Sequence, residues 1–394
     1  MKLFDKLYNA LSVDALAHRM RSIRENSPYH REENVWEHTR MVLDAYKKFY
    51  APRRSMKMQL LTLTALLFHD TGKPRARQEK FSEERGHYQT FGGHALISAR
   101  VFEDFMMSRP ELMAVLRFDA NEWRTIKWLI ENHLPYDIKD QQKRQALMTD
   151  CLAHGADTLT MFYDVLRSDA LGRISDDHAG KLAKVDAWIS QFSLVQSLQK
   201  TDFHLPQKPD HKVAMFMVGP SGSGKSTFAR GMIDSGMKPF EPDSLRMEFY
   251  FTSGFASSDN EKRDYAVAWN YCCIEKPQDF DKFWRARFVK LLNDGHDVVI
   301  DSVNSTRKSR AFYIAELRKR GYFIISCEFP VALSTVLERQ LSRLDKEVPV
   351  DTVTKQYFTV TQPRVGSEVD VAYVMWNHDL RSTAATHYNV VYNN

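Results

Sequence analysis

Histidine and aspartate recur in an ordered series through the N-terminal half of the sequence, each within or at the end of a helical run. A single helical bundle could gather them around one point. Imidazole and carboxylate groups suit Mn²⁺, Fe, Co²⁺, Ni²⁺ or Mg²⁺, and no cysteine is placed to favour a softer metal. A bound ion would generate hydroxide at neutral pH and stabilise a phosphoryl transition state. The series comprises His38, His69, Asp70, His94, His133 and Asp169.

The adjacent pair His69-Asp70 is the most informative part of this series. A lone histidine is more often structural than a ligand, but adjacent ligands at a helix end can reach the same ion. The pair is followed by Gly72-Lys73, and a lysine there could meet a substrate phosphate. We therefore expect Asp70 and Lys73 to act in a metal-dependent phosphohydrolase.

A second group of residues has the spacing of a phosphate-binding loop. Residues 219–227 read GPSGSGKST and lie between an apolar run and a helical stretch. The glycines let backbone N–H groups cradle phosphate oxygens, and the helix dipole adds to the attraction. Lys225 would reach the β- and γ-phosphates of ATP, and Ser226 would bind Mg²⁺. The expected ATP contacts are Gly219, Ser221, Gly222, Ser223, Gly224, Lys225, Ser226 and Thr227.

Residues downstream of this loop could complete a kinase centre. Asp243 and Arg246 form a DxxR pair on one helix face, where the carboxylate could accept a hydroxyl proton and the arginine could bind an acceptor phosphate. A surface ion pair is the alternative. Asp301 ends an apolar run and is a candidate metal-directed carboxylate, with Asn304 and Arg307 on the loop that follows.

Two arginines further along could act on the donor phosphates. Arg339 and Arg343 stand four residues apart on an expected helix, where they could clamp ATP and stabilise transition-state charge. Arginine pairs on helices are also common solvated faces, and that alternative stays open. The catalytic residues selected for the kinase are Lys225, Asp243, Arg246 and Arg343.

The hydrophobic pattern predicts a helical first part. Residues 1–198 carry apolar side chains at three- and four-residue spacings, as in Val35–Tyr50 and Met58–Phe68, with no alternating strand pattern. We expect an all-α bundle there, followed by a polar linker with two prolines at residues 199–211.

The pattern changes in residues 212–394. Val213–Val218 and Tyr322–Phe329 are β-rich runs, and amphipathic stretches such as Lys308–Arg320 separate such runs. Strands that alternate with helices predict an α/β domain with a parallel sheet. One last strand is expected at Val369–Trp376.

Composition narrows the class of protein. With 394 residues and 43% hydrophobic residues the chain can bury more than one core, which excludes global disorder. The net charge of +5 suits a polyanionic substrate. The four cysteines are expected to be free thiols. The charged N-terminus and the lack of 18 uninterrupted apolar residues predict a cytoplasmic protein without a membrane contact.

The motifs of the first half resemble the HD phosphohydrolase superfamily over residues 15–180. The closer resemblance is to the HD domain of CCA-adding tRNA nucleotidyltransferases. It is carried by HTRMV at 38–42, HDTGKP at 69–74, FGGHALISA at 91–99, ENHLP at 131–135 and DALGR at 169–173.

This resemblance implies roles for the ordered series. Four residues match the metal set of the family, namely His38, His69, Asp70 and Asp169. His94 and His133 match a second site bridged by the HD aspartate, so two ions are expected. HD domains of this kind act on 2′,3′-cyclic phosphates and on 2′- or 3′-phosphates. Arg75 and His87 would be phosphate contacts, or equally surface residues.

The second half resembles the polynucleotide 5′-kinase family over residues 212–360. The resemblance rests on the phosphate-binding loop, the DxxR pair, DSVN at 301–304, and Arg339 with Arg343 ahead of Val348-Pro349. It implies that Asp243 is the general base for a 5′-hydroxyl, that Arg246 engages the acceptor end, and that both later arginines engage ATP. Gln340 departs from the asparagine of many relatives.

The two halves together resemble fusions of an HD domain with a polynucleotide kinase that heal broken ends. Such an enzyme would phosphorylate 5′-hydroxyl ends with ATP and Mg²⁺, and would remove 2′,3′-cyclic or 3′-phosphates with a divalent metal. RNA is favoured over DNA as the nucleic-acid partner, with a ligase acting downstream. Two alternatives remain: an HD nucleotidase fused to a small-molecule or nucleoside kinase, and a non-catalytic nucleic-acid-binding module.

Overall fold

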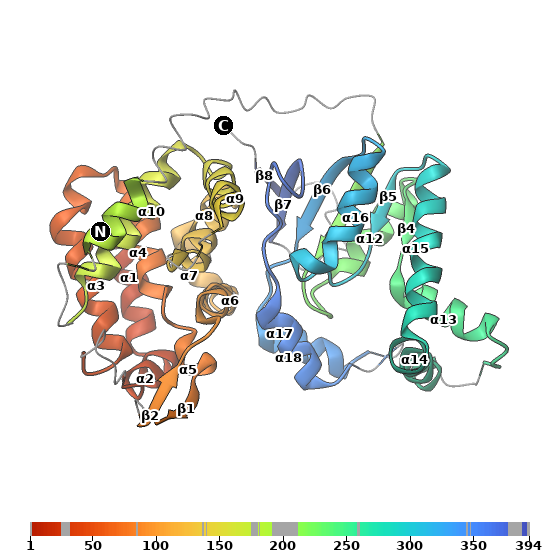
Figure 1. Cartoon of the computed structure of the whole chain (residues 1–394), viewed down its shortest axis with the longest axis horizontal. Helices are drawn as coiled ribbons and strands as arrows, with labels where there is room; N and C mark the ends of the chain where they lie inside the picture. The colour runs from red at the N-terminus through yellow and green to blue at the C-terminus, as the bar shows by residue number, and fades with distance from the viewer. Residues whose placement is uncertain are drawn as a thin grey trace. The chain divides into compact units, whose positions relative to one another are not determined.

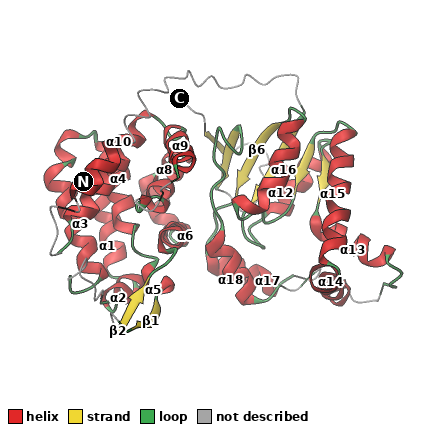
Figure 2. Cartoon of the chain, viewed as in Figure 1, coloured by secondary structure: helices red, strands yellow, loops and turns green. Residues whose placement is uncertain are grey.

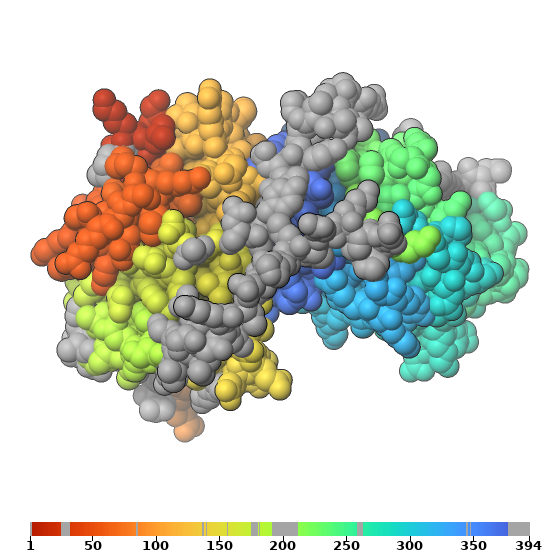
Figure 3. All heavy atoms as spheres, turned by 90° about the horizontal axis from the view of Figure 1, so that it is seen from above, coloured from red at the N-terminus to blue at the C-terminus, as the bar shows by residue number. Residues whose placement is uncertain are grey.

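The computed structural model of the chain contains two compact units, Met1–His204 and Leu205–Val391. In Figures 1 and 3 the colour of the first unit runs from red to yellow, and that of the second from green to blue. The expected linker at 199–211 lies outside the described residues. The structure describes residues 2–24, 32–83, 86–135, 138, 140–174, 180, 182–190, 212–257, 261–343, 346, 348–376 and 388–391.

The first unit is helical, as predicted (Figure 2). Its elements are α1 (Lys2–Ser12), α2 (Ala15–Arg21), α3 (Val35–Phe49), η1 (Ala51–Arg53), α4 (Met56–Phe68), α5 (Lys73–Ala76), β1 (Gln78–Ser82), β2 (Gly86–Thr90), α6 (His94–Met107), α7 (Pro110–Leu116), α8 (Ala120–Glu131), α9 (Gln141–Leu152) and α10 (Ala156–Leu171).

Helix α4 forms the centre of this bundle. Its residues from Leu61 to Phe68 are all buried, because apolar or small side chains occupy every side of the helix. Phe68 packs edge-on against Phe102 of α6, and Phe102 packs against Trp123 of α8. The C-terminal end of α4, where the His69-Asp70 pair follows, is therefore held from several directions.

An antiparallel hairpin of β1 and β2 was not expected from the sequence. It lies between α5 and α6 and is drawn in yellow in Figure 2. Four of the five residues of β1 are exposed, so its side chains do not alternate between buried and exposed. Because the sequence signal for a strand is such an alternation, this hairpin escaped the prediction.

The second unit has the expected α/β organisation. Its elements are β3 (Val213–Val218), α12 (Lys225–Asp234), β4 (Lys238–Phe240), α13 (Pro242–Thr252), α14 (Glu261–Asn270), η3 (Tyr271–Glu275), α15 (Pro277–Asn293), β5 (Val298–Ile300), α16 (Arg307–Lys319), β6 (Phe323–Glu328), α17 (Leu333–Leu341), α18 (Val350–Thr359), β7 (Val371–Met375) and β8 (Tyr388–Val391).

The strands form one sheet in the order β4-β5-β3-β6-β7-β8. The pairs from β4 to β7 are parallel, which confirms the predicted parallel sheet, and β8 is antiparallel to β7. The strand expected at Val369–Trp376 is β7, but it is not the last strand, because β8 follows it.

Helices cover both faces of this sheet. On one face Phe228 of α12 packs in a cluster with Met217 and Val299. On the other face Phe216 contacts Tyr313 of α16, which also contacts Phe288 of α15. Neighbouring residues of β3 thus serve opposite faces, as the pleat of a strand requires. The loop after β3 opens at the carboxyl end of the parallel strands, where ligands of such sheets bind.

Among the described residues, no helix combines the length and the apolar character needed to span a bilayer. All four cysteines are free thiols, as expected.

Candidate functional site

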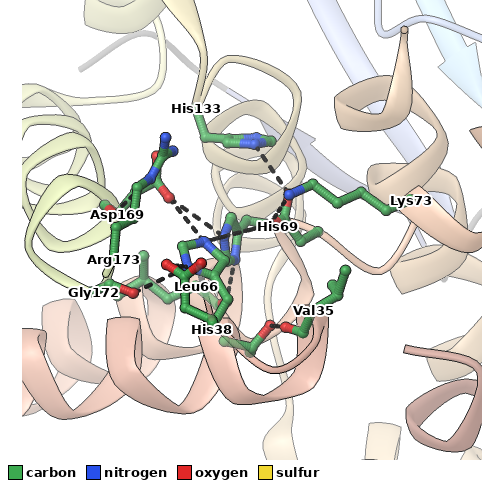
Figure 4. Close-up of polar contacts among 12 residues, drawn as sticks. Val35, His38, Leu66, His69, Lys73, His133, Asp169, Gly172 and Arg173 are labelled. Atoms are coloured by element: carbon green, nitrogen blue, oxygen red, sulfur yellow. Dashed lines mark hydrogen bonds and ion pairs between the residues drawn. The ribbon is translucent and has the colours of Figure 1, made fainter. Parts of the chain in front are cut away.

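The structure brings the six residues of the ordered series together inside the helical unit. They come from the first turn of α3, the C-terminal end of α4, the first residue of α6, the segment after α8, and α10. All of them are buried. Figure 4 shows the side chains of His38, His69 and Asp169 pointing toward one another, with His133 also directed at this centre.

These residues fall into two groups with metal-ligand geometry. His38, His69 and Asp169 form one trio, and Asp70, His94 and His133 form the other; within each trio the ligand atoms lie within 4.8 Å of one another. Side chains from far apart in the sequence therefore offer two neighbouring sets of nitrogen and oxygen donors.

Asp70 belongs to the second trio and also contacts the first. Its Oδ1 lies 3.1 Å from Nε2 of His94 and 3.6 Å from Nε2 of His133. Its Oδ2 lies 3.3 Å from Nε2 of His69 and 3.5 Å from Nε2 of His38. One carboxylate thus faces a different pair of histidines with each oxygen, which is the geometry that a bridging ligand needs.

The main chain fixes the orientation of each histidine. In every case Nδ1 lies next to a carbonyl oxygen, at 2.7 to 3.0 Å, so Nδ1 carries the proton in the neutral ring and Nε2 presents a lone pair. Nε2 of His69 then lies 3.3 Å from Nε2 of His38, and Nε2 of His94 lies 3.3 Å from that of His133. Lone pairs this close repel unless a proton or a cation lies between them. The residues present therefore fit metal ions.

The local field also favours positive charge. Burial alone would lower the pKa of His38, but its hydrogen bonds with Asp169 and Glu32 raise that pKa to about 9. Burial would likewise raise the pKa of Asp70, but His69 and Lys73 hold it well below its ordinary value. The carboxylates are therefore ionised, and a divalent ion could replace the proton of the imidazolium.

Lys73 lies beside Asp70, at the start of α5. Its Nζ is 2.8 Å from Oδ2 of Asp70. The turn that carries it packs tightly, because a Cβ on Gly72 would meet the carbonyl oxygen of His94 at 2.4 Å. Arg75 of α5 and His87 of β2 are exposed.

Two residues of this centre were missed by the sequence reasoning. Arg173 pairs with the side chain of Asp169, and its position four residues later on the helical register was a usable signal. Glu32 lies 3.5 Å from Nδ1 of His38 and accepts a hydrogen bond from the amide of Ile174. Nothing in the spacing of the motifs points to Glu32.

In the second unit, the phosphate-binding loop joins β3 to α12 as expected. Gly222 and Gly224 have φ values of 86° and 99°, which favour glycine. Gly224 precedes the first turn of α12, so the amides at the start of that helix face the loop. Ser226 and Thr227 are exposed at this helix end, whereas Ser221 and Ser223 are buried.

Lys225 folds back onto its own loop. Its Nζ donates a hydrogen bond to the carbonyl oxygen of Pro220 at 2.6 Å. Burial lowers the pKa of Lys225 to about 8; Asp301 opposes this shift, while Lys346 and Arg343 contribute to it. Several cations therefore gather around the loop, and an anionic ligand would relieve their repulsion.

The segment from α17 to α18 lies against the phosphate-binding loop. Arg339 donates to the carbonyl oxygen of Gly222 at 3.1 Å, and Arg343 donates to Oγ of Ser221 at 3.1 Å. Gln340 also donates to Oγ of Ser221, at 3.2 Å. The glutamine that departs from the family pattern thus contacts the same loop as the two arginines.

Asp243 lies in the first turn of α13, where three side chains bind its carboxylate. Arg246 and the hydroxyl of Tyr265 both donate to Oδ1, and Lys346 donates to Oδ2. Burial would raise the pKa of Asp243, but the charges of Lys346 and Arg246 hold it below its ordinary value. The carboxylate is therefore ionised, as a general base must be. Tyr265 and Lys346 were not found from the sequence.

The DSVN segment has a structural function in addition to any catalytic one. Asp301 follows β5, as expected. Asn304 is buried with a φ of 45°, and its amide donates to the carbonyl oxygens of Met217, Ile300 and Ser302. Arg307 lies 3.7 Å from Glu368. Asn304 therefore ties the ends of two strands together beneath the phosphate-binding loop.

Comparison with known proteins agrees with this geometry. Residues 34–161 match the HD domain, and residues 215–363 match an AAA domain. The chain thus carries an HD domain followed by a P-loop kinase domain, and these domains imply the use of a metal and of ATP by an enzyme.

The chain is also similar, over part of its length, to one curated protein and to one solved structure. A protein of Autographa californica nuclear polyhedrosis virus, named as a bifunctional polynucleotide kinase/RNA ligase, is 26% identical over 153 residues, which are 38% of this chain and 21% of that protein. A gluconokinase from Sinorhizobium meliloti shares 19% identity and a TM-score of 0.27 over 41% of this chain and 82% of its own. A TM-score this low does not support a conclusion about the fold or the function of this chain.

Proposed function

We propose that this chain heals the ends of broken RNA. The P-loop domain transfers phosphate from ATP to a 5′-hydroxyl, and the HD domain removes a 2′,3′-cyclic phosphate or a 3′-phosphate. The observation that carries the proposal is the pairing, on one chain, of two metal-capable trios with an ATP loop whose neighbouring helix carries Asp243 and Arg246. The named activity of the viral relative supports a nucleic acid as the acceptor.

In the kinase reaction, the chain binds both substrates and accepts one proton. The amides and Lys225 hold the donor phosphates, and Ser226 is positioned to bind the Mg²⁺ of the nucleotide. Arg339 and Arg343 supply charge beside the same loop. Asp243 accepts the proton of the attacking hydroxyl, and Arg246 binds the phosphate of the acceptor strand.

In the hydrolase reaction, the two trios would hold metal ions, and Asp70 of the second trio also contacts the histidines of the first. The bound metal, Mn²⁺, Co²⁺, Ni²⁺ or Fe, would supply hydroxide and polarise the phosphate at neutral pH. The residues of the chain orient the substrate: Lys73 is directed at the centre and can release Asp70 to bind a phosphate oxygen. The main-chain carbonyls keep all four imidazoles in the required tautomer.

A single oligonucleotide tests both activities. An RNA with a 5′-hydroxyl and a 2′,3′-cyclic phosphate is incubated with the chain, labelled ATP and Mn²⁺, Ni²⁺ or Mg²⁺, and both ends are analysed. We expect label at the 5′ end and a free 3′ end. A DNA strand and a free nucleoside serve as comparison acceptors. Phosphorylation of the nucleoside but not of either strand would replace this proposal with the small-molecule kinase.

A further inference from the structure

Lys346 lies between the phosphate-binding loop and the proposed general base. It stands between α17 and α18, three residues after Arg343, which donates to Ser221 of the loop. Its own Nζ pairs with Oδ2 of Asp243 and lies 5.3 Å from the ring centre of Tyr265. The side chain of Lys346 is 16% exposed and that of Asp243 is 41% exposed, so water reaches the pair and screens it in part.

The three donors that bind the carboxylate of Asp243 weaken it as a base, because each stabilises the ionised form over the protonated one. Arg246 and Tyr265 bind Oδ1 from α13 and α14, and Lys346 binds Oδ2. An acceptor hydroxyl needs one carboxylate oxygen for its proton. Of the three donors, Lys346 alone comes from the segment that also contacts the phosphate-binding loop.

The charges near Lys346 favour movement of its ammonium group toward the phosphates of bound ATP. Lys225, Arg343 and Lys346 interact electrostatically around the loop, opposed by Asp301 and Asp243. A triphosphate bound at the loop would place several negative charges among these cations. It would attract the flexible ammonium group of Lys346 more strongly than a single carboxylate does.

We infer that Lys346 is a further catalytic residue, which moves from Asp243 to the phosphates of ATP when the nucleotide binds. The move frees Oδ2 of Asp243 and adds positive charge at the donor. The acceptor O–H bond then breaks and its proton moves to Oδ2. The acceptor oxygen forms a bond to the γ-phosphorus, and the bond between the γ-phosphorus and the β,γ-bridging oxygen breaks to release ADP. This inference rests on the proposed kinase function.

ATP binding, measured without an acceptor, separates this role from a structural one. The probe is the β,γ-imido analogue of ATP with Mg²⁺, and only binding that Lys225→Ala abolishes is counted. Asp243→Asn should bind the analogue roughly three- to tenfold more tightly than the unmodified chain, because Lys346 is released from its partner. Lys346→Met should bind it more weakly.

The double variant is the decisive comparison. In the Lys346→Met background, Asp243→Asn should give no gain in affinity. An equal gain in both backgrounds would mean that Asp243 merely repels the nucleotide, and weaker binding by both single variants would mean that the pair is structural; either result overturns the inference. Lys355→Met, which changes an exposed lysine of α18, should leave affinity unchanged.

Turnover adds a second readout. Lys346→Met should lower kcat for phosphorylation of the 5′-hydroxyl RNA by about 100-fold, and Lys346→Arg, which keeps a cation, should recover most of it. Unchanged kcat in Lys346→Met would overturn the catalytic role. Absence of analogue binding by the unmodified chain would instead refute the proposed kinase, and this inference with it.

Discussion

In the HD domain main-chain carbonyl oxygens orient the four histidines, whereas in the P-loop domain other side chains hold the proposed base, Asp243. Each histidine of the two trios binds a carbonyl oxygen through Nδ1 and is buried. Beside the phosphate-binding loop, by contrast, Asp243 is bound by the side chains of Arg246, Tyr265 and Lys346. The first centre is preorganised for an ion, and the second must exchange its internal contacts for those of its substrates.

The largest effect on the second centre is expected from loss of its base. Asp243→Ala should lower 5′ phosphorylation by about 10²–10⁴-fold, because it removes the carboxylate that accepts the hydroxyl proton in the proposed reaction. Removal of the 3′-terminal phosphate should persist in the same preparation, since its groups lie in the other unit. Loss of both activities in a folded variant would contradict the inference that the two centres act independently.

A smaller and more selective effect is expected from Arg246→Ala. If this arginine binds the acceptor phosphate, the KM for the oligonucleotide should rise by about tenfold or more, while the affinity for ATP changes little. Steady-state kinetics with each substrate varied separately give both values. A change mainly in the KM for ATP would assign Arg246 to the donor side.

The smallest effect is expected from loss of Asn304, whose amide ties strand ends together beneath the phosphate-binding loop. Asn304→Ala removes an amide that donates to three carbonyl oxygens, and should lower the free energy of unfolding of the P-loop domain by about 1–3 kcal/mol. Denaturant titration followed by kinase activity reports this domain. Asn304→Gly separates the loss of the amide from backbone strain, because glycine adopts a φ of 45° without strain whereas alanine does not. Equal stability of all three proteins would contradict the structural role.

How far the sequence could predict these centres depends on how local the signal is. The phosphate-binding loop and the adjacent His69-Asp70 pair are contiguous motifs, so their residue types and spacing were sufficient to locate them. The parallel sheet and the helical bundle were also predicted, because long periodic segments specify them. Lys346 could not be found this way, since its partner Asp243 is remote in sequence and its own neighbours form no motif.

The same argument explains the missed hairpin and the missed last strand. Strand β1 is exposed along most of its length, and β8 is a short edge strand, so neither has a strong hydrophobic period. The role of Asn304 was also hidden, because only the folded chain brings the carbonyl of Met217 to the loop after β5.

Metal content of Asp70→Ala and His133→Ala, measured beside hydrolase activity, tests the preorganised two-ion centre most directly. The unmodified chain should bind about two ions. Asp70→Ala should lose most of this metal and all hydrolase activity while its kinase activity persists, because its carboxylate faces both trios. His133→Ala should keep about one ion, at the trio of His38, His69 and Asp169. Equal metal loss in the two variants would indicate one shared site, and unchanged metal in Asp70→Ala would contradict the ligand assignment.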